Sequence, residues 1–578
     1  MGVREMVARY VVSPRGGRRG YPDITSALRA AAARGRAAQI EIAPGHYDEM
    51  LLVRGEVRLI ALEGAGSVVV SRPHGTVLES SGAVHVEGLV LTGNDTEADA
   101  VACQWGTLTL DHTEVRVRGG VAVHARPHTS VTLRDSTVRH GRTLFSGSSG
   151  LVERCRFTDA ADNAVAVIEG ARVSVHGSRI EGSRIHGVRV CNAYGVVTGC
   201  ELTGTGNAAL MADTRAELTV ADCTITAVHA EGIMFIEQSR GSVDRTRVTD
   251  ARHGIGAASG ADPVVRGCVL TACRDTGINV QTSGRGRFED CQVVGAGNVA
   301  VFSTKGGAPE VHGCRVSGGN VGIAVTGGAR GRFTGIGIED LTGSALRVFD
   351  DDSTAVFERV RVDRCPSGLE VRGNGGTTAE VADSEFHDFA LAAVAVGGQA
   401  RVSLKGIRAE RGVLGFGVGE EASLRVSDSG VRAVTSGGAV VFGSARLFAT
   451  DLAVTGSGAL GVYGKDSAYL DVTRGAFTDC AAVGAAFDDE CGGRLVDCSV
   501  SGPGDTAVRH NGRVDLVSLS TSLPVVRNEE PVEVPPTIVN IFNGPVFNKP
   551  VINSHILWNN DNVNHVIQRH TTEDGPGT

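Results

Sequence analysis

The sequence predicts an all-β solenoid, and three observations carry that prediction. Short runs of alternating apolar and polar residues recur with a period of roughly 20–25 residues, which lies in the range of solenoid repeats. Glycine is abundant, at 79 of 578 residues, and aromatic residues make up only 4% of the chain. Such a composition fits many short strands joined by tight turns. A chain of this length would otherwise suggest several domains.

The repeat is clearest between residues 171 and 284, where five successive segments share one pattern. Each segment, such as GVVTGCELTGTGNAALMADTR (195–215), holds three short strands separated by Gly, Asn, Asp or Ser turns. Stacked coils of this kind form parallel sheets, with strands about 4.8 Å apart. We expect about twenty coils, mostly within residues 81–528, and hence a length on the order of 95 Å.

Residues 1–80 are expected to form an N-terminal cap and the first coils. YPDITSALRAAAARGRAAQIEIAPGHYDEMLLV (21–53) predicts a short helix over 24–32, a turn, a strand, and a PG turn followed by another strand. The helix would cover the first coil, whose apolar core would otherwise face water.

The cysteines indicate an internal ladder. One slot, two residues before an apolar residue, recurs from coil to coil and holds a cysteine, serine or threonine. Its occupants include Cys155, Ser178, Cys200, Cys223, Thr246, Cys268, Cys291, Cys314, Ser384, Ser429 and Cys498. A fixed slot means a fixed side of the strand, so a small, weakly polar residue there fits a buried stack. Metal binding would need paired spacings such as CxxC, and none occurs.

The opening of the chain resembles the right-handed parallel β-helix superfamily, which includes pectate lyases and pectin methylesterases. The resemblance is carried by the 24–32 helix and by IEIAPGHYDE (40–49). It extends over about nine-tenths of the chain and implies a right-handed parallel β-helix with an N-terminal capping helix, but it indicates chemistry only weakly. Similar regions occur in intracellular actinobacterial proteins, some joined to AAA-type ATPases. No GxxxxGK[ST] motif is present here, so we expect no ATPase.

Composition argues against several classes of partner. No window approaches 18 uninterrupted apolar residues, so no membrane span is expected. The N-terminus lacks the apolar core of a signal peptide, and a cytoplasmic protein is therefore expected. The formal net charge of −9 argues against a nucleic-acid binder.

An active site on this fold is expected on the exposed face of one parallel sheet, here the one formed by the third strand of each coil. Its outward pairs run from Ala166 and Ile168 onward to Glu370 and Arg372. A pectin methylesterase resemblance would imply two aspartates and an arginine together on this face, and a pectate lyase resemblance would imply calcium-binding carboxylates with an arginine base. The outward positions offer neither set. Three or more ionisable side chains meeting in one groove would instead indicate an enzyme.

Two charged positions on the outward face, Asp213 and Arg347, have separate interpretations. Asp213 is expected to stand alone. Arg347 faces Glu370 one coil away, which indicates an ordinary cross-strand ion pair.

The acidic run VFDDDS (348–353) leaves three possibilities open. Asp350, Asp351 and Asp352 end a strand and receive no carboxylates from the neighbouring coils. The first possibility is a solvated turn. The second is a calcium site, which needs six or more oxygen ligands. The third is part of a catalytic site. No cofactor other than this possible calcium ion is expected.

An apolar patch is predicted on the outer face of the third strands. Met211, Met234, Ile236 and Phe302 project outward there and are poor in charged neighbours. A contiguous exposed patch of this kind marks a contact surface for a protein or polysaccharide partner. The alternative is that a long turn or the C-terminal tail covers it.

The C-terminal segment differs in composition from the repeat. EEPVEVPP (529–536) predicts a proline-rich linker, residues 537–570 are rich in asparagine and β-prone, and residues 571–578 look disordered. The residues of the expected association segment include Asn540, Phe542, Asn543, Phe547, Trp558, Asn562 and Asn564. The segment is similar to short prion-like or amyloid signalling motifs of bacterial immunity proteins, although Pro545 and Pro550 interrupt it. Capping of the solenoid, self-association, an amyloid-type adaptor and chance composition all remain open.

The sequence therefore favours a non-catalytic β-helix scaffold with a C-terminal oligomerisation segment. The alternatives are a carbohydrate-active β-helix enzyme (a lyase, esterase or hydrolase) and a self-assembling signalling or defence effector.

Overall fold

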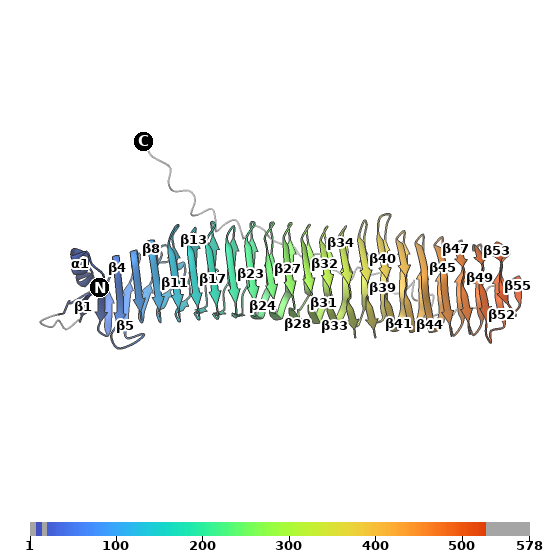
Figure 1. Ribbon diagram of the computed structural model, residues 1–578, viewed down its shortest axis with the longest axis horizontal. Helices are drawn as coiled ribbons and strands as arrows, with labels where there is room; N and C mark the ends of the chain where they lie inside the picture. The colour runs from blue at the N-terminus through green and yellow to red at the C-terminus, as the bar shows by residue number, and fades with distance from the viewer. Residues whose placement is uncertain (1–6, 14–19, 528–578) are drawn as a thin grey trace, which may run out of the picture. The chain divides into compact units, whose positions relative to one another are not determined.

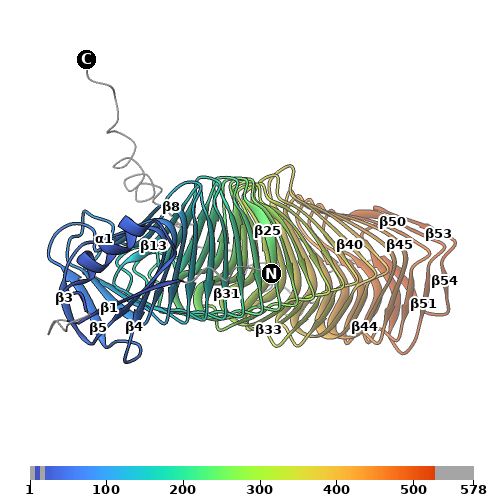
Figure 2. The same cartoon turned by 60° about the vertical axis from the view of Figure 1, so that its left-hand side comes forward.

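The prediction of an all-β solenoid is confirmed. The computed structural model describes residues 7–13 and 20–527, which form a parallel β-solenoid of about 21 turns with 64% strand and a single short helix (Figure 1). The coils stack one upon another, and nearly every strand pairs in parallel with its counterpart in the next coil (Figure 2).

Each coil contributes one strand to each of three sheets, which are called here the first, second and third sheets in the order in which the chain meets them. Two successive coils consist of β17 (Arg172–His176), β18 (Arg179–Glu181), β19 (Val188–Cys191), β20 (Tyr194–Thr198), β21 (Glu201–Thr203) and β22 (Leu210–Asp213). In other coils a strand continues around a corner. β24 (Thr224–Phe235) and β26 (Arg247–Ala258) each pass from the second sheet into the third.

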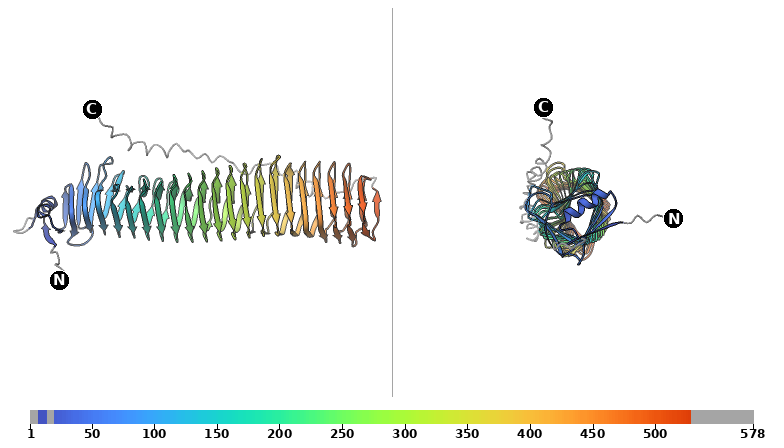
Figure 3. Two further views of the ribbon diagram at one scale, coloured as in Figure 1. Left: turned by 45° about the horizontal axis from the view of Figure 1, so that its top comes forward. Right: turned by 90° about the vertical axis from the view of Figure 1, so that its left-hand side faces the viewer.

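The helix α1 (Ile24–Arg34) lies across the N-terminal end of the solenoid, as the predicted cap (Figure 3). Asp23 caps its first turn by accepting a 2.6 Å hydrogen bond from the Ser26 amide, and Gly35 ends it in the left-handed conformation. The Glu49 carboxylate accepts hydrogen bonds from two further amides at the helix N-terminus, those of Ile24 and Thr25. The apolar face of the helix, including Ile24 and Leu28, is buried against the first coils.

Glycine recurs where the second sheet turns into the third. A Cβ atom on Gly254 would lie 2.4 Å from the Gly277 carbonyl oxygen, and one on Gly277 would lie 2.7 Å from the Ala300 carbonyl oxygen. Adjacent coils approach each other too closely at this corner for a larger side chain in those coils, which accounts for part of the high glycine content.

The cysteine slot is an internal ladder, as predicted. All thirteen cysteines are free, and all but Cys191 are buried. The Ser178 hydroxyl accepts a 3.0 Å hydrogen bond from the Cys155 amide of the preceding coil and donates to the His176 carbonyl at 3.0 Å. The slot thus satisfies a backbone amide at a corner where no strand partner reaches it. Burial raises the pKa of the Cys155 thiol to about 11, so it stays protonated and unreactive.

Replacing Ser178 by alanine should destabilise the solenoid by about 1–3 kcal/mol, because the Cys155 amide loses its buried partner. Ser178→Cys is the matched control, since cysteine fills the same slot in other coils, and it should cost less than about 1 kcal/mol. Urea denaturation midpoints measure both effects. Equal midpoints for Ser178→Ala and Ser178→Cys would contradict the ladder's hydrogen-bonding role.

Among the described residues, no helix is long and apolar enough to cross a membrane.

Candidate functional site

One outward-facing column of side chains runs along the whole third sheet. It contains the outward residue at the centre of each strand, and we call it the middle column. The strand pairing defines it as Leu52, Glu79, Ala102, His124, Leu144, Ala166, Arg189, Met211, Met234, Gly256, Asn279, Phe302, Ala324, Arg347, Glu370, Ala395, Gly417, Val440, Tyr463, Ala486 and Arg509. From Ala166 to Glu370, the middle column consists of the first residue of each outward pair predicted from the sequence.

Three ionisable side chains meet near the N-terminal end of the middle column. Asp99 precedes β8 (Val101–Asp111), while His124 and Arg126 lie in and just after β10 (Val121–Ala125) of the next coil. One Asp99 carboxylate oxygen accepts from His124 Nδ1 at 2.7 Å and from Arg126 Nη2 at 2.8 Å. We call these three residues the N-terminal cluster.

The electrostatics of the cluster fix the roles of its members. Burial raises the pKa of Asp99, but the hydrogen bonds and charges of His124 and Arg126 outweigh burial and hold that pKa below its ordinary value. Asp99 is therefore ionised and can only accept hydrogen bonds, so His124 Nδ1 carries the proton. In the neutral ring Nε2 is then the basic nitrogen, and no described residue hydrogen-bonds to it.

The N-terminal cluster has a carboxylate and a large aromatic side chain in its neighbourhood. Glu79, Ala102 and His124 are consecutive members of the middle column, so Glu79 and His124 flank the small Ala102 side chain at about 9.6 Å, twice the strand spacing. Trp105 lies within β8, just after the register shift at Gln104, and 61% of its surface is exposed. The strand of Ala102 thus also carries an exposed indole, three residues further along the chain.

The sequence search missed the N-terminal cluster. The outward positions predicted from the sequence begin at Ala166, which lies two coils beyond His124. The coils around Asp99 are also less regular, because the pairing of β6 (Leu78–Glu87) with β8 shifts by one residue at Gln104. Aligning VACQW (101–105) with VAVHA (121–125) would have brought the two strands together.

The expectation that Asp213 stands alone is wrong. Its carboxylate forms a 2.7 Å ion pair with Arg189 Nε of the preceding coil, and the two side chains are only 2% and 13% exposed, respectively. Burial lowers the pKa of the neighbouring His186 to about 4, and the Arg189 charge acts in the same direction. This second cluster has no member as exposed as Arg126 of the N-terminal cluster, whose side chain is 45% exposed.

Glu231 and His253 are adjacent in the strand pairing beside the middle column, and both are buried. Burial raises the pKa of Glu231 to about 7, although the charge of Arg252 opposes it. Burial lowers the pKa of His253 to about 4, and His253 Nδ1 lies 2.7 Å from the Thr276 hydroxyl. His253 is therefore neutral at pH 7, whereas Glu231 is neutral only below about pH 7.

Replacing Glu231 by glutamine should change how stability depends on pH. Because the folded-state pKa of Glu231 is raised, its contribution favours folding at acid pH and is lost as pH rises from about 4.5 through about 7. At pH 8 the Glu231→Gln variant should be more stable than the native protein by about 1–3 kcal/mol, and at pH 4.5 the difference should vanish. Urea midpoints at both pH values test this, and parallel pH profiles would contradict it.

Arg347 and Glu370 form the ion pair that the sequence predicted, at 3.1 Å. The pair is buried rather than solvated, with side chains 9% and 1% exposed. Burial raises the pKa of Glu370 and outweighs the opposing charge of Arg347. Arg347 Nε also lies 3.2 Å from the Ser344 hydroxyl.

The prediction of an exposed apolar patch is wrong. Met211, Met234, Ile236 and Phe302 lie on the outer side of the third sheet, as expected, but they are only 1%, 0%, 6% and 4% exposed, respectively. These four side chains therefore form no exposed contact patch, and their role as a binding surface stays a prediction.

The acidic run VFDDDS lies at the end of β36 (Ser344–Phe349), and its carboxylates point to different neighbours. Asp350 accepts from the Thr326 hydroxyl, and Asp351 accepts from the Asn374 amide at 3.0 Å. Asp350 and Asp352 have φ angles of +65° and +60°, a conformation that aspartate tolerates in turns. This geometry favours the turn, and the calcium site stays a prediction.

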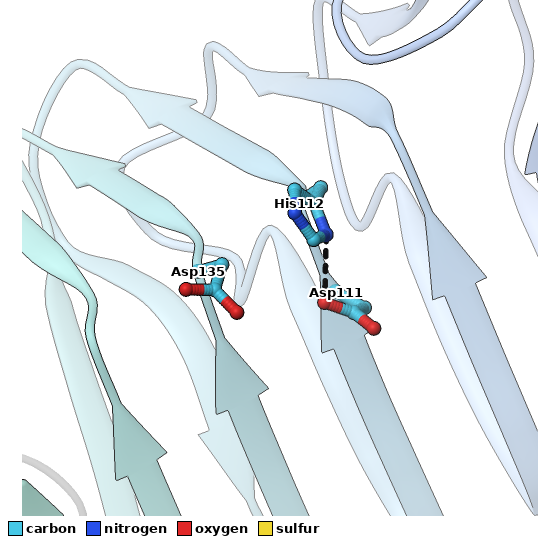
Figure 4. A group of neighbouring side chains, drawn as sticks. All are labelled: Asp111, His112 and Asp135. Carbon is cyan, nitrogen blue, oxygen red and sulfur yellow. Dashed lines mark hydrogen bonds and ion pairs between the residues drawn. The ribbon is translucent and has the colours of Figure 1, made fainter.

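One group of possible metal ligands exists among the described residues, at the corner between the first and second sheets. Ligand atoms of Asp111, His112 and Asp135 all lie within 4.8 Å of one another (Figure 4). The Asp111 carboxylate lies 2.9 Å from His112 Nδ1, and both oxygens of Asp135 accept from the Arg154 guanidinium at 2.8 Å. The Asp135 carboxylate is therefore already neutralised by Arg154, so the group gives little support for a metal site.

The expected association residues, from Asn540 to Asn564, lie outside the described residues, as do the linker and the last eight residues.

Comparison with known proteins identifies the fold. A family model described as a right handed beta helix region matches residues 171–316 and 274–409. No curated protein matches the chain.

Similar solved structures include three with different roles. The pectin methylesterase from Aspergillus niger has 13% identity and a TM-score of 0.29, over 36% of this chain and 85% of that one. The PL6 family alginate lyase AlyGC has 10% identity and a TM-score of 0.25, over 90% and 100%. The bacteriophage Phi29 gene product 12 N-terminal fragment has 10% identity and a TM-score of 0.32, over 86% and 89%. Likenesses this weak give no information about activity.

Proposed function

The chain is a right-handed parallel β-helix, and from that premise we propose that it acts on a polysaccharide, with acid–base chemistry centred on His124. The observation that carries the proposal is the N-terminal cluster, in which Asp99 binds both His124 and Arg126 on the outer face of the third sheet. Because three ionisable side chains meet in this cluster, we place an enzyme ahead of the non-catalytic scaffold.

His124 is the acid–base group of the proposed site. Asp99 orients the ring and keeps the proton on Nδ1, which leaves Nε2 to accept a proton from a hydroxyl group or a water molecule. Glu79, on the opposite side of Ala102, is placed to act on the other side of a bound sugar. The strands of Glu79 and His124 are about 9.6 Å apart, and the side chains project from them on either side of the strand that carries Ala102.

A polysaccharide fits the site better than a small metabolite for two reasons. The middle column continues in register on both sides of Ala102, so a linear polymer can extend across neighbouring coils. Trp105, which is largely exposed, offers an indole face for stacking against a sugar ring. Arg126, whose side chain is 45% exposed, favours a polymer that bears carboxylates.

Tryptophan fluorescence tests this binding directly. Trp105 and Trp558 are the two tryptophans of the chain, so a Trp558→Phe variant reports on Trp105 alone. Titration with acidic oligosaccharides should quench or shift its emission, and Arg126→Ala should weaken the response. Unchanged emission across a panel of acidic and neutral glycans would contradict the proposal.

A second candidate function, a binding scaffold that self-associates through its C-terminal segment, is favoured by a separate observation. The middle column is uncharged from Met211 to Ala324 and again from Ala395 to Ala486, whereas the outer faces of the other sheets carry many charges. Light scattering on the full chain and on a variant lacking residues 537–578 would test the self-association. Equal masses would show that residues 537–578 do not mediate self-association.

A further inference from the structure

A groove lies on the outer face of the second sheet. Its volume is about 500 Å³, within the range of roughly 300–1,000 Å³ that is typical of small-molecule sites. It crosses the second-sheet residues of four consecutive coils, which belong to β31 (Gln292–Thr304), β33 (Arg315–Val325), β35 (Gly337–Glu339) and β38 (Arg361–Asp363). The groove thus extends over three strand spacings, about 14 Å, which is longer than a single sugar ring.

The groove exists because a glycine interrupts a column of long side chains. Gln292, Arg315, Gly337 and Arg361 occupy the same outward position in consecutive coils. A Cβ atom on Gly337 would have no neighbouring heavy atom within 4 Å, so the space above this residue is open. The side chains of Arg315 and Arg361 therefore flank a hollow whose floor is backbone.

The corner beside the groove is open for the same reason. Gly313 and Gly335 turn the chain from the first sheet into the second in two successive coils, with φ angles of +63° and +65°. The coils before and after them hold Asp290 and Arg359 at this position. Two successive corners next to Gly337 thus carry no side chain, and both glycines line the groove.

Arg315 gives the groove a positive charge that no acidic side chain balances. Several arginines at its position in other coils form ion pairs with glutamates of the same sheet, namely Arg156 with Glu181, Arg179 with Glu201, and both Arg361 and Arg408 with Glu385. The Arg315 side chain is exposed, and its guanidinium has no ion pair or hydrogen bond within the described part of the chain. A guanidinium of this kind binds carboxylates in a bidentate manner.

The second column of the groove supplies acceptors for hydroxyl groups. Ser317, Glu339 and Asp363 follow one another there in consecutive coils. Arg364 pairs with both carboxylates, with Glu339 at 2.8 Å, and so neutralises them. A carboxylate has about four lone-pair sites, so Glu339 and Asp363 can still accept hydrogen bonds from a ligand.

We propose that this groove binds a uronic acid unit of an acidic polysaccharide. The sugar carboxylate pairs with Arg315, and the ring hydroxyls donate to Glu339 and Asp363. A compact anion such as phosphate has no hydroxyl groups to offer these carboxylates and would be repelled by them.

The proposal goes beyond the proposed function and can fail separately from it. Arg315 and Ala324 lie in the same strand, β33, and Ala324 is nine coils from His124 along the third sheet, about 43 Å. The groove is therefore a second binding site for the polymer, on another face of the solenoid.

Arginine modification tests the proposal in the native protein. Phenylglyoxal labelling followed by mass spectrometry measures how fast Arg315 reacts. A trisaccharide of galacturonic acid, at ten times its dissociation constant, should slow that reaction by roughly tenfold, because only the unliganded fraction reacts. Arg247, an exposed arginine three coils away in the same column, is the internal control and should react equally with and without the trisaccharide.

Two glycine variants locate the binding. Gly337→Gln should fill the groove and abolish the protection of Arg315, and it should fold normally because Gly337 has open space and no left-handed backbone. Gly430→Gln is the matched control, since Gly430 holds the same position four coils further on, and it should leave the protection unchanged. Equal urea midpoints for the native protein and both variants confirm that they are folded.

Several results would overturn the proposal. They are reactivity of Arg315 unchanged by the trisaccharide in the native protein, protection that persists in a folded Gly337→Gln variant, and equal protection of Arg247. Equal protection by a neutral trisaccharide or by inorganic phosphate would likewise rule out a uronic acid as the recognised group. Trp105 emission, recorded in the same samples, reports on the acid–base site independently of these outcomes.

Discussion

Replacing Glu370 by alanine is expected to destabilise the solenoid by about 3–5 kcal/mol, because the buried Arg347 guanidinium loses its counter-charge. The two side chains are 1% and 9% exposed, so water cannot take over the role of the carboxylate. The Ser344 hydroxyl is the remaining polar neighbour of Arg347 Nε, and it carries no charge. Urea denaturation of the native protein and the variant measures the loss.

Two controls separate this effect from general damage to the sheet. The double variant Arg347→Met/Glu370→Leu removes both charges and should recover most of the lost stability. Glu385→Ala breaks the exposed Arg361–Glu385 pair of the second sheet and should cost less than about 1 kcal/mol. A loss below about 1 kcal/mol for Glu370→Ala would show that the pair is solvated.

Replacing His124 by alanine is expected to lower turnover of the polysaccharide by about 10²–10⁴-fold, the range by which general acid–base catalysis contributes. Oligosaccharide affinity should change far less, because Trp105 and Arg126 remain in place. Product release measured by mass spectrometry, alongside Trp105 fluorescence, separates turnover from binding.

Asp99→Asn tests the positioning role of Asp99. An amide can present its NH₂ group to His124 Nδ1 and so favour the wrong tautomer of the ring, and turnover should fall steeply with little loss of stability. Because the asparagine of this variant carries no charge, the pH dependence of the remaining activity should also shift. His46→Ala, an exposed histidine of β3 (Gly45–Asp48), should leave turnover unchanged. Loss of activity in His46→Ala as well would indicate a non-specific effect.

The repeating part of the fold was predictable because each coil repeats the same pattern of strands and turns. The ladder slot of Cys155 and the pairing of Arg347 with Glu370 both follow from counting residues between coils. Asp213 escaped the same counting because its partner Arg189 lies diagonally across the strand pair, opposite Met211.

Two further features could not be predicted from periodicity. The N-terminal cluster depends on coils of unequal length, where Gln104 interrupts the pairing between β6 and β8. The burial of Met234 is the second, because alternation along a strand shows only which side of the sheet a residue faces and not how exposed it is.

The proposed function requires the outer face of the third sheet around Ala102 to bind and transform a polysaccharide. The most direct test is a crystal structure of the Glu79→Gln variant soaked with an oligosaccharide that changes Trp105 emission. We expect a sugar ring over Ala102, with one hydroxyl within hydrogen-bond distance of His124 Nε2 and a neighbouring ring against Trp105. An oligosaccharide bound only on the first or second sheet, with the surface over Ala102 empty, would contradict it.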